Sequence, residues 1–227
     1  MKKLFYLILL MLLTGTVTYA NNLVIGTPTY NSTNNQISFT IKWDNSWRVN
    51  AGPSNWDAVW IFVKRQNCSG TNNWVHQKLS TTSGDHLAKL ASNSATSTDV
   101  QVDAVSDGMG VFVRRIGTNV VGNVASQIIT IKLAGTNPSI TTSNTDNFEV
   151  IGVEMVYVPQ GQFYIGDGRA TNNTNFSAGT AAQPVLVTST TQTNGIGSAI
   201  NYTSSTAYGC PVPLPSTFPL GFNGFYC

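Results

Sequence analysis

The feature that most limits how this chain folds is a two-residue alternation of apolar and polar side chains. The stretch ISFTIKW at residues 37–43 has an apolar residue at every odd position, and ITIKL at residues 129–133 repeats the pattern. Because successive side chains of a strand point to opposite faces, this period predicts half-buried strands. AVWIFVKR at residues 58–65 is apolar on both faces, as expected of a central strand covered on two sides. The alternation therefore predicts antiparallel β-structure.

Turn-forming residues separate these stretches and two further predicted strands, DVQVDAV at residues 99–105 and GMGVFVRR at residues 108–115. NSTNNQ, NAGPSN and GTNVVGN are rich in Asn, Gly, Ser and Pro, which favour tight turns. Short strands at this spacing are typical of a two-layer sandwich. We predict a mainly β chain with an antiparallel β-sandwich accessory domain over residues 21–134, and only a short helical turn at residues 86–91.

Composition narrows the class of protein. Charged residues make up 10% of the chain, against about 25% in ordinary soluble domains, which is typical of secreted β-rich surface proteins. The chain has 12 basic and 10 acidic residues. Lys2 and Lys3 belong to a segment that we expect to be removed, so 12 − 2 = 10 basic residues then face 10 acidic ones. This balance gives no basic footprint for a nucleic-acid partner.

Residues 1–20 have the pattern of a secretory signal peptide. Lys2 and Lys3 precede an apolar run at residues 4–13, and small and polar residues follow up to Ala20. A membrane-spanning helix needs about 20 apolar residues, so the run at residues 4–13 is too short to span a membrane. We expect no membrane span once the signal peptide is removed. No cysteine lies near the cleavage region, so we expect no lipid anchor there. The sequence predicts a secreted, periplasmic or cell-surface protein.

The chain has three cysteines, Cys68, Cys210 and Cys227. In an oxidising compartment an odd number implies a free thiol, an intermolecular disulfide or a missing partner. Because Cys227 is the last residue, we expect a missing partner, and the sequence predicts no pairing.

Tryptophans provide the candidate ligand-binding residues. Trp43 and Trp60 stand in strand patterns, so we expect them in the core. Trp47 and Trp56 stand in the polar stretch DNSWRVNAGPSNWD, next to Asp57. An exposed indole packs against the apolar face of a sugar ring while a nearby carboxylate accepts hydroxyl hydrogen bonds. We therefore predict that Trp47, Trp56 and Asp57 bind a glycan or a protein partner.

No other motif points to chemistry. Asp44, Asp57, Asp103 and Asp107 lie at strand ends and turns, but their spacing does not match a calcium-binding loop. The two histidines, His76 and His86, lack a zinc-binding spacing, and the chain has no nucleophile elbow. We predict no catalytic, cofactor-binding or metal-binding residue in this chain.

A polar stretch without apolar period, residues 135–147, is predicted to be a linker to a second region. That region, residues 148–227, opens with a predicted β-hairpin, in which VEMVYV and QFYI flank a turn at Gly161. A Thr- and Asn-rich excursion follows, interrupted by a predicted strand in PVLVTST at residues 184–190. The prolines of CPVPLPSTFPLGFNGFYC favour extended backbone that leads into a last strand.

Two stretches of this region carry a family resemblance. EMVYVPQGQFYIGDG at residues 154–168 is similar to the opening signature of the formylglycine-generating enzyme (sulfatase-modifying factor) family, and PLGFNGFYC at residues 219–227 resembles its next landmark. The order of signal peptide, Trp-rich sandwich and this opening resembles secreted bacterial members of the Bacteroidetes kind. The resemblance implies that residues 148–227 are the incomplete start of a C-type-lectin-related α+β domain.

The resemblance also implies chemistry outside this chain. Complete family members are copper-dependent oxidases that hold copper by two thiolates, a ligand set suited to Cu(I), and they use calcium structurally. None of Cys68, Cys210 or Cys227 matches those thiolates by position, so we expect no cofactor and no competent active site here. We interpret the chain as the amino-terminal fragment of such a protein, with the sandwich as an accessory interaction module. The alternative is a non-catalytic cell-surface module that binds glycans or proteins.

Overall fold

The computed structural model describes residues 21–68, 73–92, 98–135, 146–165, 177–178, 184–192, 200–201 and 220–227. The predicted signal peptide, Cys210 and most of the predicted linker lie outside these residues. The chain divides into two compact units. The first takes Met1–Asn50 and Trp56–Met155, and the second takes Ala51–Asn55 and Val156–Cys227.

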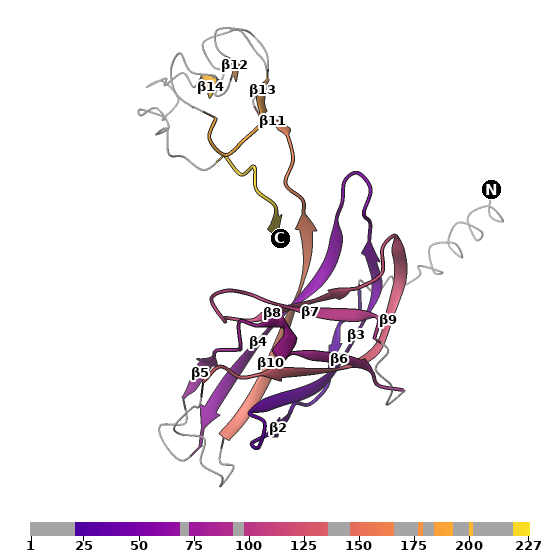
Figure 1. Cartoon of the computed structure of the whole chain (residues 1–227), viewed down its shortest axis with the longest axis vertical. Helices are drawn as coiled ribbons and strands as arrows, with labels where there is room; N and C mark the ends of the chain where they lie inside the picture. The colour runs from indigo at the N-terminus through magenta and orange to yellow at the C-terminus, as the bar shows by residue number, and fades with distance from the viewer. Residues whose placement is uncertain are drawn as a thin grey trace, which may run out of the picture. The chain divides into compact units, whose positions relative to one another are not determined.

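The first unit is built from antiparallel strands, which confirms the predicted mainly β class (Figure 1). Its strands are β1 (Val24–Ile25), β2 (Thr29–Asn31), β3 (Gln36–Arg48), β4 (Trp56–Asn67), β5 (Trp74–Gln77), β6 (Leu87–Leu90), β7 (Val100–Ala104), β8 (Val111–Arg115), β9 (Val120–Lys132) and the greater part of β10 (Asp146–Val158). A single 3₁₀ turn, Ser83–Asp85, precedes β6. The helical turn predicted at residues 86–91 is therefore wrong, because Leu87–Leu90 pair with β9 instead.

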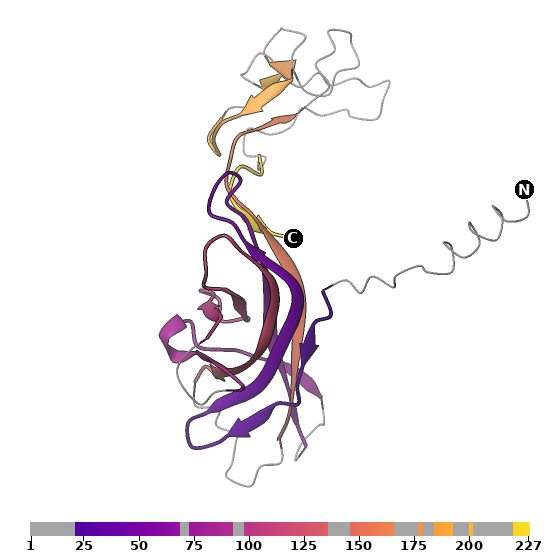
Figure 2. The same ribbon diagram turned by 90° about the vertical axis from the view of Figure 1, so that its right-hand side faces the viewer.

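The sheet of the first unit bends over on itself and is nearly closed. In one half, β3 pairs with β1, β2 and β9, and β9 pairs with β6. In the other half, β4 pairs with β10, β5 and β8, and β8 pairs with β7. The halves join where Arg48 of β3 pairs with Trp56 of β4. Figures 1 and 2 show β3 and β9 as long curved strands that run side by side.

One hydrophobic core fills the space between the two halves. The odd positions of residues 37–43 of β3 and 59–63 of β4 point into it, as the alternation predicts, and Trp43 is 1% exposed. The buried members are Ile37, Phe39, Ile41, Trp43, Val59, Ile61, Val63, Leu79, Val100, Val102, Val111, Val113, Val124, Ile129, Ile131 and Leu133. Burial of each large aliphatic side chain contributes about 1.5–3 kcal/mol.

Strand β10 starts earlier than the sequence predicts. Asp146 and Asn147 were expected in the linker, but β10 begins at Asp146. The reason is tertiary: Arg65 of β4 donates a hydrogen bond from Nε to Asp146 Oδ2 at 3.0 Å, and Phe148 packs against the core. The division between the units falls after Met155, so residues 148–155, predicted in the second region, are part of the first unit.

The second unit contains short strand pairs among its described residues. β11 (Phe163–Ile165) pairs with β13 (Val185–Val187), β12 (Ser177–Ala178) pairs with β14 (Ile200–Asn201), and β15 (Phe225–Tyr226) pairs with the end of β10. The predicted hairpin is therefore wrong, because β11 pairs with β13 and not with β10. The predicted strand in residues 184–190 and the last strand are confirmed. A small cluster buries Val185 and Val187 against Phe163, Ile165, Leu220 and Phe222.

Within the described part of the chain, no helix has the length and apolar character needed to cross a membrane.

Candidate ligand-binding sites

The predicted ligand-binding residue Asp57 lies inside the first unit. It is 5% exposed, and its carboxylate accepts three hydrogen bonds: from Trp43 Nε1 at 2.6 Å, Ser46 Oγ at 2.7 Å and the Trp47 backbone N–H at 2.9 Å. A buried carboxylate needs such donors to offset its desolvation. The structure thus gives Asp57 an internal role in holding β3 against β4.

Trp47 and Trp56 lie in strands, although the polar residues around them predicted a loop. Trp47 belongs to β3 and pairs with Val121 of β9. Trp56 opens β4, and its ring lies 5.6 Å from the Arg48 guanidinium and 5.3 Å from that of Arg114. Guanidinium groups at these distances are attracted to the face of an indole. Trp56 is therefore packed between neighbours of its own unit and is half-buried.

A row of aromatic side chains follows the outer face of β4. The odd residues Val59, Ile61 and Val63 point into the core, so alternation places the even residues on the opposite face. Those even residues include Trp56, Trp60 and Phe62, all half-buried. From Trp56 to Gln66 the strand covers about 33 Å, at about 3.3 Å per residue.

Neighbouring strands extend this row. Trp60 pairs with Phe112 of β8 across the ladder, with ring centroids 4.7 Å apart and tilted by 51°. Phe62 stacks on His76 of β5 at 6.1 Å and 16°. Trp74 pairs with Gln66 at the far end of β4 and is 45% exposed. We call Trp56, Trp60, Phe62, His76 and Phe112 the aromatic track.

Gly110 leaves room for the centre of the track. A Cβ atom at this position would lie 2.4 Å from Cζ2 of Trp60 and 2.6 Å from the Ile61 carbonyl oxygen. Because no real Cβ approaches so closely, a residue without a side chain is required there for the Trp60 ring to keep this position.

The end of the track at Trp56 carries charge. Arg114 forms an ion pair with Asp103 of β7, with Nε 2.5 Å from Oδ2, and Gln101 donates to the same carboxylate at 2.6 Å. Arg48 donates from Nη1 to the carbonyl oxygens of Arg115 and Ile116 at 2.9 and 3.0 Å. With two guanidinium groups and one carboxylate, this end is net positive.

The sequence interpretation missed the track because it expected β4 to be covered on both faces. A signal was nevertheless present: the aromatic residues of WDAVWIFVKR all fall on even positions, while the aliphatic core residues Val59, Ile61 and Val63 fall on odd ones. An aromatic face and an aliphatic face on the same strand indicate that the two faces have different surroundings.

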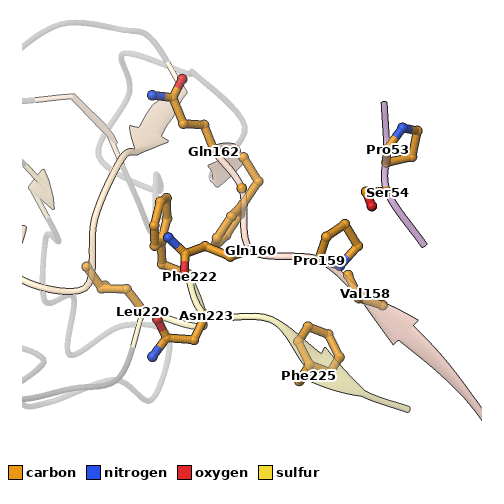
Figure 3. Close-up of a pocket in the computed structure, with 13 residues that line it drawn as sticks. Pro53, Ser54, Val158, Pro159, Gln160, Gln162, Leu220, Phe222, Asn223 and Phe225 are labelled. Carbon is orange, nitrogen blue, oxygen red and sulfur yellow. The ribbon is translucent and has the colours of Figure 1, made fainter. Parts of the chain in front are cut away.

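A hollow lies within the second unit (Figure 3). Its volume is about 770 Å³, in the range of small-molecule sites. The lining is mostly apolar and aromatic, with the amide side chains of Gln160, Gln162 and Asn223. Its apolar and small members are Pro53, Val158, Pro159, Gly161, Phe163, Leu220, Gly221, Phe222 and Phe225, with Ser54. No charged residue contributes to this lining.

Within the described residues, no three His, Cys, Asp or Glu side chains lie close enough together to hold a metal ion. Cys68 and Cys227 are exposed free thiols.

Comparison with known proteins gives no match: no family model, no curated protein and no solved structure is similar to this chain.

Proposed function

We propose that the first unit is a non-catalytic carbohydrate-binding module of an exported protein, and that an extended glycan lies along the aromatic track. The single observation that carries this proposal is the placement of Trp60, Phe112 and Phe62 in a continuous half-buried row on the outer face of the sheet. The glycan-binding alternative predicted from sequence is kept here, but with different binding residues. The buried Asp57 is replaced by the aromatic side chains on the outer face of β4.

The row has the properties that sugar recognition needs. Aromatic faces offer apolar area to the C–H groups of pyranose rings. The rings are held by cross-strand neighbours, so little side-chain freedom is lost when a ligand orders them. Consecutive contacts along one strand suit a linear polymer, because every second side chain of a strand lies on the same face at intervals of about 6.6 Å.

The proposal is tested by screening the mature chain, residues 21–227, on an array of soluble and immobilised oligosaccharides, followed by calorimetry with the best ligand. Trp60→Ala is expected to weaken binding about tenfold, equivalent to about 1.4 kcal/mol. Leu87→Ala is the matched control, because Leu87 is 60% exposed on β6, a strand that contributes no residue to the track. An array without any bound glycan, or equal affinities for wild type and Trp60→Ala, contradicts the proposal.

We also propose that the chain is the amino-terminal part of a secreted protein similar to the formylglycine-generating enzyme family, with the first unit as its accessory module. The specific observation in favour is that the two stretches carrying the resemblance are paired: Tyr157 lies opposite Tyr226 and Val158 opposite Phe225. The apolar hollow beside them is the kind of surface that further chain of such a domain covers.

Sequencing the gene beyond the Cys227 codon tests this second proposal. We expect the reading frame to continue and to encode a pair of cysteines, which as a thiolate pair bind Cu(I) in the longer protein. A stop codon directly after Cys227 contradicts it. Export is tested separately: amino-terminal sequencing of the protein recovered outside the cytoplasm is expected to start at Asn21.

A further inference from the structure

A second cavity lies in the first unit, lined by residues of β2, β5 and the start of β10 and by the stretch before β2. Its volume is about 530 Å³, which is enough for one or two sugar rings. The lining residues are Thr27, Pro28, Tyr30, Trp74, Asp146, Asn147, Phe148 and Glu149. Three aromatic rings and two carboxylates thus surround one hollow.

Asp146 is the unusual member of this lining. Its side chain is 6% exposed, and Oδ2 forms an ion pair with Arg65 Nη2 at 2.8 Å. Oδ1 is closed off from solvent, and no donor among the described residues reaches it. A buried acceptor without a donor is unfavourable. A hydrogen-bond donor that enters the cavity would relieve this cost.

The aromatic side chains have different roles in the cavity. Tyr30 and Phe148 contact each other, with ring centroids 4.8 Å apart at 33°, and both pack against the core. They form a rigid apolar wall. Trp74 is 45% exposed and therefore offers ring surface to a ligand.

We propose that this cavity binds the terminal pyranose ring of a neutral glycan. The ring stacks on Trp74. The Asp146 side chain turns on binding, so that Oδ1, which is covered in the free protein, accepts a hydrogen bond from one hydroxyl group of the ring. In taking a carbohydrate as ligand, the inference rests on the proposed function.

Charge decides which sugars fit. Arg65 neutralises one carboxylate of the lining, that of Asp146, and Glu149 leaves the cavity net negative. Acidic sugars are therefore repelled. Ligands that donate hydrogen bonds without carrying negative charge are favoured.

The test is calorimetry of the mature chain with methyl glycosides of glucose, galactose, mannose and N-acetylglucosamine, with galacturonate and calcium as further probes. At least one neutral glycoside is expected to bind. Trp74→Ala and Asp146→Asn are each expected to weaken that binding at least tenfold. The asparagine keeps the shape of Asp146 while presenting a donor in place of an acceptor. Val75→Ala is the matched control, because Val75 is a neighbouring exposed residue of β5 that does not line the cavity.

Other outcomes separate this inference from the proposed function. Trp60→Ala is expected to weaken oligosaccharide binding more than methyl glycoside binding, because Trp60 lies six residues along β4 from Gln66, the partner of Trp74. If oligosaccharides bind in a Trp60-dependent way but Trp74→Ala and Asp146→Asn bind every glycoside as wild type does, the cavity assignment is wrong and the track stands. Tighter binding of galacturonate than of any neutral glycoside, or calcium binding lost in Asp146→Asn, also overturns the assignment. Because Trp74 is exposed, Trp74→Ala tests the cavity even if Asp146→Asn fails to fold.

Discussion

The indole Nε1 of Trp43 donates a 2.6 Å hydrogen bond to Oδ2 of Asp57, and both side chains are buried in the first unit. The other carboxylate oxygen accepts from Ser46 Oγ, which in turn accepts a hydrogen bond from Arg115 Nε at 3.0 Å. This network joins β3, β4 and β8 where the two halves of the sheet meet. Asp57 therefore orders the fold instead of presenting a carboxylate to a ligand.

Asp57→Ala is expected to lower the free energy of unfolding by about 3 kcal/mol, because it leaves buried donors without an acceptor and Arg115 without its carboxylate network. Urea denaturation measures the loss. Asp107→Ala, in an exposed turn where the carboxylate accepts a hydrogen bond from the Met109 backbone N–H, is expected to cost less than about 1 kcal/mol. If the Asp57→Ala protein is as stable as wild type but no longer binds glycan, Asp57 is a ligand-binding residue and its structural role is contradicted.

Trp56 and Arg114 are expected to be coupled. Their cation–π contact of 5.3 Å is half-buried, so a double-mutant cycle with Trp56→Ala and Arg114→Gln should give an interaction energy of about 0.5–1 kcal/mol. Thermal or urea unfolding of the four proteins measures it. Additive effects of the two substitutions would show that the contact contributes nothing to stability.

Gly152→Ala is expected to destabilise the protein by about 1–3 kcal/mol through overpacking. The added Cβ would lie 2.5 Å from Ile25 Cδ1 and 3.1 Å from Val59 Cγ1 and Ile61 Cδ1. Gly84→Ala provides the control, because its Cβ would meet nothing within 4 Å. A Gly152→Ala protein as stable as the control would mean that this part of β10 does not pack on the core.

His86 is expected to make stability depend on pH. The side chain is 6% exposed, Nδ1 accepts a hydrogen bond from the Lys132 backbone N–H, and Nε2 lies 3.0 Å from the Ser80 carbonyl oxygen. Burial lowers the pKa of His86 below its ordinary value of 6.5, although the Ser80 carbonyl and Asp85 act in the opposite direction. The neutral imidazole is therefore the form that the fold holds.

The sign of the effect follows from this pKa shift. Below about pH 6.5 the unfolded chain takes up a proton that folded His86 does not, so stability falls as the pH drops from 6.5 towards the folded pKa. One proton limits the slope to about 1.4 kcal/mol per pH unit. Urea unfolding between pH 7.5 and 5 measures it. His86→Gln should lose this dependence, whereas the control His76→Gln should retain it; equal slopes in all three proteins would contradict the assignment.

The strands were predictable from sequence because their side-chain period is local. The alternation in ISFTIKW and ITIKL predicted strands at residues 37–43 and 129–133, now parts of β3 and β9, and the burial of the odd positions within these stretches, including Trp43. The ends of β10 were not predictable in the same way. Asp146 and Asn147 are polar and follow a polar stretch, yet Asp146 is in a strand because Arg65, 81 residues away in sequence, pairs with it.

The local sequence pattern also did not predict which strands pair with each other. The PQGQ stretch correctly predicted an interruption after Val158, but not that β11 would pair with β13 while β10 pairs with β15. Likewise the polar surroundings of Trp56 predicted a surface loop, whereas pairing with Arg48 and the approach of Arg114 bury part of its ring.

The sequence by itself determined which residues face the core and which face outward, because that choice repeats every second residue along a strand. Only the tertiary structure decided which outward residues become neighbours. The register between β4, β5 and β8 brings Trp60 to Phe112 and Phe62 to His76, and the fold places Trp74 beside Asp146 in one cavity. Such contacts join residues far apart in the chain, and their geometry depends on strand pairing that no local pattern encodes.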